Sequence, residues 1–163
     1  MQGGFLEAIH SVRSDIEALV YGQQLAVLST AGANGHPYAS LVAIVAEADL
    51  SRIYFATSRA TRKFANLTAE PHAAMLLENS RNRQSDFHEA MAVTAVGRVQ
   101  EVVVGDAERV LARYKERHPQ LVAFVNAPST ALLQLTVRTY YLVNRFQKVM
   151  EYHVGGKADP AAG

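Results

Sequence analysis

The chain has 163 residues, with 16 Lys and Arg against 15 Asp and Glu, and therefore a formal net charge of +1. This balance argues against a nucleic-acid binder that works through a broad basic field, and a hydrophobic content of 49% is enough for one core and excludes disorder for most of the chain. Cysteine is absent, which excludes disulfide scaffolds, thiolate metal sites and cysteine nucleophiles, so any redox chemistry must come from a cofactor.

Targeting and membrane signals are missing from the sequence. There is no run of about 18 apolar residues, the length that a membrane-spanning helix needs. The first residues, MQGGFLEAIHSVRSD, lack the basic-then-apolar order of a signal peptide. We therefore expect a cytoplasmic protein with no membrane partner and no nucleic-acid partner.

The first half of the chain predicts one helix followed by consecutive strands. Apolar residues recur at spacings of three and four between Phe5 and Val20, the pattern of an amphipathic helix over residues 4–21. The pair Asn34-Gly35, which readily adopts positive φ in a tight turn, separates two apolar runs and predicts a β-hairpin. The predicted strands of this half are 25–30, 38–46, 52–57 and 73–77.

The second half predicts further strands with helices between them. A short helix follows the third strand, with Ser58 available as its N-cap and Pro71 ending it. Residues 78–90 are strongly polar and predict a surface loop, and Asp106 opens a helix that runs to His118. The remaining predicted elements are a strand over 91–104, a short helix over 120–126, a long strand over 129–146 and a last strand over 147–154.

These elements predict a mainly β fold with peripheral helices. The strands follow one another without crossover helices, which disfavours a doubly wound parallel sheet. A six- to seven-stranded antiparallel barrel, closed or split, with helices packed outside it accounts for the hairpins and the long late strands. We expect one domain over residues 1–154 and a disordered tail over 155–163.

The turn after the third strand carries an unusual concentration of positive charge. Arg59, Arg62 and Lys63 fall in or near the first turn of the predicted short helix, where unpaired backbone N–H groups already present positive potential. This favours a bound anion, with phosphate as the first choice. The neighbouring hydroxyl donors are Thr57, Ser58 and Thr61. The alternative is a solvated basic turn that pairs with Glu70 or Glu78.

Four segments carry a family resemblance: YASLVAIV, IYFATSRATRKFANLTAEP, AAMLL and AVTAVGRVQEV. They resemble the pyridoxamine 5′-phosphate oxidase-related family of flavin-binding split barrels. The resemblance covers about residues 22–153, and it implies that the Arg-Lys pair holds the phosphate of FMN while the second strand lies along the isoalloxazine ring. The residues that the resemblance assigns to FMN in these segments are Ser40, Leu41, Val42, Ala43, Thr57, Ser58, Thr61, Arg62 and Lys63. It further implies a homodimer with FMN in a groove between the two barrels.

Departures from the family pattern affect the substrate rather than the cofactor. The true oxidase has basic residues where this chain has Ser40 and Val45, and a glutamine where it has Ala92; Arg145 has no convincing role as a substrate ligand. The resemblance therefore implies an FMN-dependent oxidoreductase that acts on an unknown small molecule, and not oxidation of pyridoxamine phosphate. The alternatives are a non-catalytic flavin or haem carrier and a reductase that uses the deazaflavin F420.

The polar stretch 79–86 resembles an insertion found in a compact branch of the same family. Ser80, Arg81, Asn82 and Gln84 are expected to reach across a dimer groove to FMN or to a substrate; the alternative is a flexible surface loop. His88, beside this stretch, is the one histidine with a candidate acid–base or haem-side role. No metal-binding or hydrolytic motif occurs, and we expect no metal site.

Overall fold

The computed structural model describes residues 2–144 and 148–156, so that Arg145 and the predicted tail from residue 157 onward lie outside the described residues. Its α-helices are α1 (Gln2–Gly22), α2 (Arg62–Ala69), α3 (Asp86–Glu89), α4 (Val104–Arg117) and α5 (Val122–Asn126). Its strands are β1 (Leu25–Ala31), β2 (Pro37–Ala46), β3 (Arg52–Ser58), β4 (His72–Glu78), β5 (Ala92–Glu101), β6 (Thr130–Asn144) and β7 (Lys148–His153).

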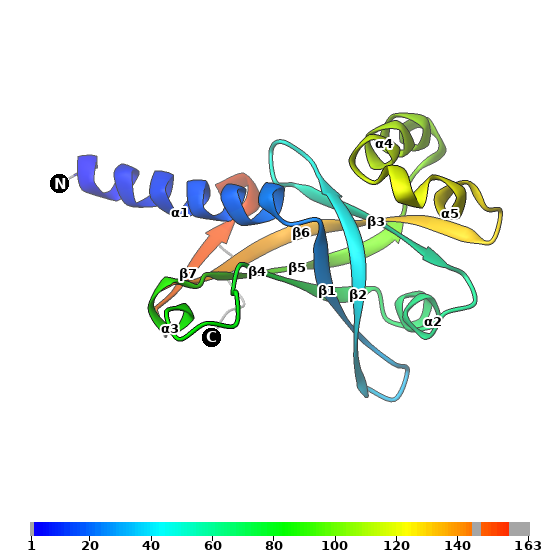
Figure 1. The fold of residues 1–163 in the computed structure, drawn as a ribbon, viewed down its shortest axis with the longest axis horizontal. Helices are drawn as coiled ribbons and strands as arrows, with labels where there is room; N and C mark the ends of the chain where they lie inside the picture. Colours follow the sequence, from blue (N-terminus) through cyan, green and yellow to red (C-terminus); the bar gives the residue numbers. More distant parts are fainter. Residues whose placement is uncertain (1, 145–147, 157–163) are drawn as a thin grey trace.

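The strands form one antiparallel sheet that closes on itself (Figure 1). Its order is β3-β2-β1-β4-β5-β6-β7, and a further pairing of β3 with β6 closes the first six strands into a barrel. Closure is possible because β6 is 15 residues long: its first half pairs with β3 and its second half with β7. The predicted fold class, an antiparallel barrel with helices outside it, is confirmed.

The core lies inside the barrel and beneath α1. Ile16, Leu19 and Val20 of α1 are buried in the same cluster as Leu28 of β1 and Phe55 of β3. Burial of each large aliphatic side chain contributes about 1.5–3 kcal/mol. The helical spacing of these apolar residues is thus accounted for, because they form one stripe of the C-terminal half of α1 that packs against the barrel, while the first turns of α1 extend beyond the sheet (Figure 1).

A β-bulge between Val96 and Gly97 bends β5 where it runs along β6. Gly97 has no alternative there, since a Cβ atom at this position would collide with the backbone carbonyl of Thr136. The bulge therefore requires a residue without a side chain.

Several predicted boundaries are wrong. β5 ends at Glu101 and not at residue 104, and α4 begins at Val104, so Asp106 lies in the first helical turn instead of capping it. The helix begins early because the N–H of Asp106 already donates to the carbonyl of Val103 at 2.9 Å. The predicted loop over 78–90 contains the short helix α3, and the predicted tail begins with a 3-10 turn over Val154–Gly156.

Candidate functional site

The turn between β3 and α2 is held by hydroxyl groups. Thr61 is the N-cap of α2: its Oγ1 accepts the N–H of Phe64 at 3.3 Å and donates to the carbonyl of Ser58 at 2.8 Å. The hydroxyl of Thr57, which is buried, lies 3.0 Å from that of Thr61. The prediction that Ser58 caps the helix is wrong, because the helix begins later in the chain and the Ser58 hydroxyl accepts the N–H of Ala60 instead.

Two of the three cations lie at the start of α2 without a carboxylate. Arg62 and Lys63 are the first two residues of the helix. The Arg62 guanidinium lies 5.4 Å from the centre of the Tyr38 ring, and Lys63 has no partner within the part of the chain that the structure describes. Positive side chains at a helix N-terminus are unfavourable by themselves, so this end of α2 suits an anion.

Arg59 does not belong to this group. Its guanidinium makes a bidentate ion pair with Glu101, with distances of 2.6 and 2.7 Å, and lies over the ring of Phe64. The expectation of an unbalanced charge at Arg59 is therefore wrong, and so is the alternative that Glu70 or Glu78 neutralises the turn. Glu70 instead pairs with the neighbouring His72.

The barrel is open between β2 and the start of α2. β2 pairs with β3 only over Ile44–Ala46, so its backbone edge from Pro37 to Ala43 has no partner strand on that side. A hollow of about 550 Å³ lies between the β1–β2 turn and α2, and Tyr38, Arg62 and Asn66 line it. Of the residues predicted to bind FMN, Arg62 alone lines this hollow, and the unpaired β2 edge reaches it only at Pro37 and Tyr38. An exposed polar backbone edge of this kind can hydrogen-bond to a ligand.

The predicted second-strand residues face in two directions. Val42 is buried in the barrel, whereas the side chain of Leu41 lies on the outer face and is 60% exposed. Ala43 packs beside the apolar residues between β2, α4 and α5. Ser40 is half-buried, and its hydroxyl is buried with no hydrogen-bond partner. Any common role of the four residues therefore rests on their backbone and on the free hydroxyl of Ser40.

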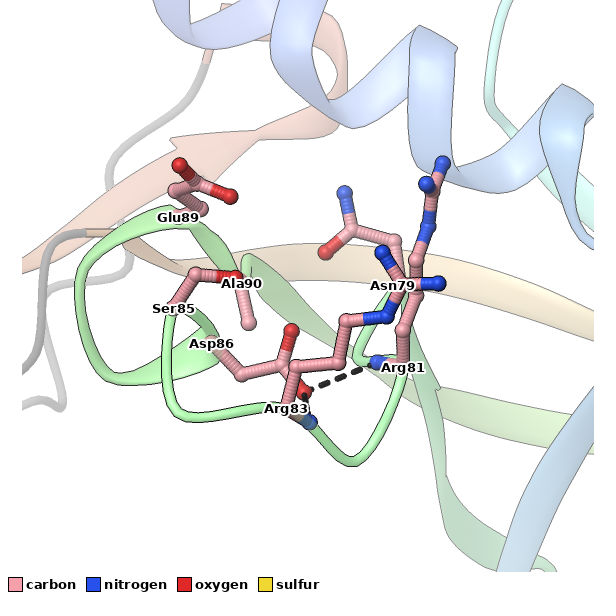
Figure 2. A pocket seen from close by; sticks show the side chains of 7 residues that line it. All are labelled: Asn79, Arg81, Arg83, Ser85, Asp86, Glu89 and Ala90. Atoms are coloured by element: carbon pink, nitrogen blue, oxygen red, sulfur yellow. Dashed lines mark hydrogen bonds between the residues drawn. The ribbon is translucent and has the colours of Figure 1, made fainter.

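The polar loop is folded and lies far from α2. The carboxylate of Asp86 accepts the N–H groups of Arg81 and Arg83 at 2.9 and 2.8 Å, so the segment is not a featureless surface loop (Figure 2). These backbone hydrogen bonds hold the pKa of Asp86 below its ordinary value. α2 and α3 lie toward opposite ends of the molecule (Figure 1). The structure thus does not bring the predicted loop residues together with Arg62 in one chain. They are Ser80, Arg81, Asn82 and Gln84.

The family model for pyridoxamine 5′-phosphate oxidase matches residues 12–144. The chain belongs to this family. The match includes the split between β2 and α2 and also the polar loop, and it confirms the resemblance seen in the sequence. A comparison with curated proteins finds no match.

Solved structures share the fold at low identity. A haem binding protein from Mycobacterium smegmatis has a TM-score of 0.75 and 14% identity, over 84% of this chain and 55% of that one. General Stress Protein 26 from Bacillus anthracis str. Sterne has a TM-score of 0.66 and 17% identity, over 87% of this chain and 98% of that one. HutZ, the haem storage protein from Vibrio cholerae, has a TM-score of 0.65 and 17% identity, over 76% of this chain and 88% of that one. The chain thus spans about half the length of the mycobacterial protein.

Other predictions meet mixed outcomes. His88 lies on α3 with an exposed side chain and does not line the hollow in the polar loop. In the described ranges no helix is long and apolar enough to cross a membrane, and no cluster of three potential ligand side chains could hold a metal ion. The sequence analysis included the stretch that contains Arg83, but it did not foresee that the carboxylate of Asp86 orders the loop by accepting backbone N–H groups; the signal was an acidic residue shortly after two arginines in a polar segment.

Proposed function

We propose that this protein binds FMN in the split between β2 and α2 and is an FMN-dependent oxidoreductase acting on a small molecule. The observation that carries the proposal is that two complementary features meet at one hollow, which Arg62 of α2 and Tyr38 of β2 line together. One is the start of α2, where Lys63 has no partner in the described residues; the other is the β2 edge from Pro37 to Ala43, which lacks a partner strand. A phosphate and a heteroaromatic ring need such groups.

The donor set at the start of α2 fits a phosphate. Lys63 offers a point charge and Arg62 offers a planar fork of N–H donors. The hydroxyls of Thr57 and Thr61 bond to each other, and Thr61 also donates to the carbonyl of Ser58, so we assign these two residues the role of shaping the turn around the phosphate. The first backbone N–H groups of the helix add their dipoles. Ser58 is the remaining residue of the proposed phosphate site.

The β2 edge suits the ring of the cofactor. The backbone of Leu41, Val42 and Ala43 would supply donors and acceptors to the ring's polar edge, and the partnerless hydroxyl of Ser40 would supply one more. Bound FMN supplies hydride or electron transfer, while the protein anchors it and tunes its potential through these hydrogen bonds.

The proposal includes a homodimer. The outer face of the sheet carries apolar side chains in one cross-strand row: the half-buried Val27 of β1 lies opposite the exposed Leu41 of β2 on one side and opposite the exposed Leu76 of β4 on the other. Leu25 extends the row. A second copy would cover this patch. It would also bring its own polar loop toward the first copy's FMN, and the loop residues involved are Ser80, Arg81, Asn82 and Gln84.

The test is the absorption spectrum of the purified protein together with a double variant. We expect a flavin spectrum, and we expect Arg62→Ala with Lys63→Ala to release the flavin. Arg59→Ala is the matched control, because Glu101 already neutralises Arg59 and its loss removes no phosphate ligand. Stoichiometric flavin in the double variant contradicts the phosphate site. Reduction of bound flavin by NADH or NADPH, followed by reoxidation by a substrate other than oxygen, separates an enzyme from a carrier.

A haem-binding role is the second candidate, since two proteins of the same fold are described as haem binding and haem storage proteins. The same spectrum distinguishes the candidates: haem gives a Soret band, and F420 has a deazaflavin spectrum. A Soret band with no flavin absorption favours the carrier and contradicts the oxidoreductase. His88 is the residue to replace in that case, and its exposed position on α3 makes it accessible to a ligand.

A further inference from the structure

A second hollow, of about 260 Å³, lies in the polar loop between β4 and β5 (Figure 2). Its volume is just below the range of about 300–1,000 Å³ that is typical of pockets for whole small molecules, so it suits a small ligand or one end of a larger one. The polar side chains that line it are Asn79, Arg81, Arg83, Ser85, Asp86 and Glu89.

The loop around this hollow is fixed at both ends. Asn79 accepts the N–H of Met91 through its side-chain oxygen at 2.8 Å and donates its own N–H to the carbonyl of Met91 at 3.2 Å, which ties the beginning of the loop to its end. Asp86 holds the middle by accepting the N–H groups of Arg81 and Arg83. The two arginines are therefore anchored by their backbone, independently of their side chains.

The side chains of the two arginines are free to bind something else. Both extend from the loop on the side of Asn79 (Figure 2), and neither guanidinium has an ion pair or hydrogen bond within the described residues. The oxygen of Asn79 is occupied by Met91, which leaves its amide NH₂ as a further donor. Two guanidiniums and an amide make a set of donors with no acceptor among the residues that the structure describes.

The carboxylates that line the hollow do not serve as acceptors for the two guanidiniums. One oxygen of Asp86 accepts two backbone N–H groups, and the pKa of this carboxyl is lowered by those bonds and by the charge of Arg83. Glu89 lies on the opposite side of the hollow from the two guanidiniums (Figure 2), and it makes no ion pair with either. Arg81 and Arg83 therefore keep most of their capacity for an external anion.

We propose that this hollow is an oxyanion-binding site, in which Arg81, Arg83 and the amide of Asn79 hold a carboxylate or phosphate group of a small molecule. Guanidiniums bind both groups through paired, charge-assisted hydrogen bonds. Within one chain the hollow lies far from the start of α2 (Figure 1), and anion binding to it does not require bound flavin, although Arg81 is also one of the loop residues proposed to reach the other copy's FMN in a dimer. The site would select small molecules that carry a carboxylate or phosphate group. It assigns a role to Arg83 and Asn79, which have none in the proposed flavin site.

The test is titration of the full-length protein with inorganic phosphate and, separately, with acetate, followed through the backbone amide NMR signals of residues 79–90. We expect saturable shifts in this loop with a dissociation constant in the millimolar range or below. We expect Arg83→Gln to weaken binding by about tenfold or more. The anion that binds more tightly identifies a phosphate or a carboxylate as the natural group. No saturable shift with either anion overturns the proposal.

Two variants test whether the anion binds in the ordered loop itself. The alternatives are that it binds at α2 and the loop only responds, or that the positive charge of the region attracts it without a defined site. In the double variant Arg62→Ala with Lys63→Ala, the anion should still shift the NMR signals of the loop. Loss of these shifts would mean that the anion binds at α2, and it would overturn the proposed site in the loop. Asp86→Asn removes a negative charge but weakens the acceptor that orders the loop. If the anion binds in the ordered loop, this variant should bind it more weakly. Stronger binding would mean that the anion is attracted only by the net positive charge of the region, and it would overturn the proposal. Arg83→Gln should unfold like the wild type, because its guanidinium has no partner in the described chain.

Discussion

Replacement of Ser40 by alanine should change stability and flavin affinity in opposite directions. The Ser40 hydroxyl is buried without a hydrogen-bond partner, and an unsatisfied buried polar group costs about 1–3 kcal/mol. Ser40→Ala removes this group and leaves a side chain that fits the same space. We therefore expect the flavin-free protein to be stabilised by about 1 kcal/mol, which corresponds to a rise of about 2–4 °C in Tm for a protein of this size.

The same variant should bind FMN more weakly, since the hydroxyl is proposed to donate to the cofactor; loss of one hydrogen bond predicts a dissociation constant raised by about three- to tenfold. Urea unfolding of the flavin-free protein and quenching of FMN fluorescence measure the two effects. Ser29→Ala, at an exposed position of the neighbouring strand, is the control and should change neither. A destabilised flavin-free Ser40→Ala protein would mean that the hydroxyl has a partner, and an unchanged flavin affinity would remove Ser40 from the site.

Three further predictions concern charge, backbone and assembly. Burial tends to raise the pKa of Glu47, but hydrogen bonds from Tyr54, Arg109 and Arg113 outweigh it and hold this pKa below 4.5. The ionised Glu47 therefore contributes its full stabilisation above pH 4.5, and this contribution is lost as the pH falls through the lower pKa of the folded state. In a plot of the unfolding midpoint against pH, Glu47→Gln should make the decrease at acid pH less steep. An unchanged decrease contradicts this prediction. Gly97→Ala should destabilise by about 1–3 kcal/mol in urea unfolding, whereas Gly105→Ala, in open space on α4, should be neutral or stabilising; equal effects would remove the steric argument. Leu41→Asp should convert the proposed dimer to a monomer in sedimentation, and a wild-type protein that is already monomeric would refute the shared site.

The strands were predictable because their signals are local. The signals are the alternation of apolar and polar residues, the Asn34-Gly35 turn and the absence of crossover helices between strands. Each depends on residues that are close together in the sequence, and the strands that they predict are present in the barrel. Tyr54 and Phe55, in the middle of the predicted strand 52–57, are fully buried. The helix boundaries were less accurate, because the cap of α2 depends on where the chain turns after β3 and not on which hydroxyl stands first in the sequence.

By itself, the sequence determined that a cysteine-free chain of nearly neutral charge has no broad basic field, and it predicted local anion binding at Arg62 and Lys63. The tertiary structure decided which charges are free for that task. Arg59 is neutralised by Glu101 from a strand 42 residues further along the chain, while the guanidiniums of Arg81 and Arg83 meet no carboxylate from any distant part of the described chain. Partners distant in the sequence meet only when the barrel closes, and for that reason no local pattern could have separated the paired arginine from the unpaired ones.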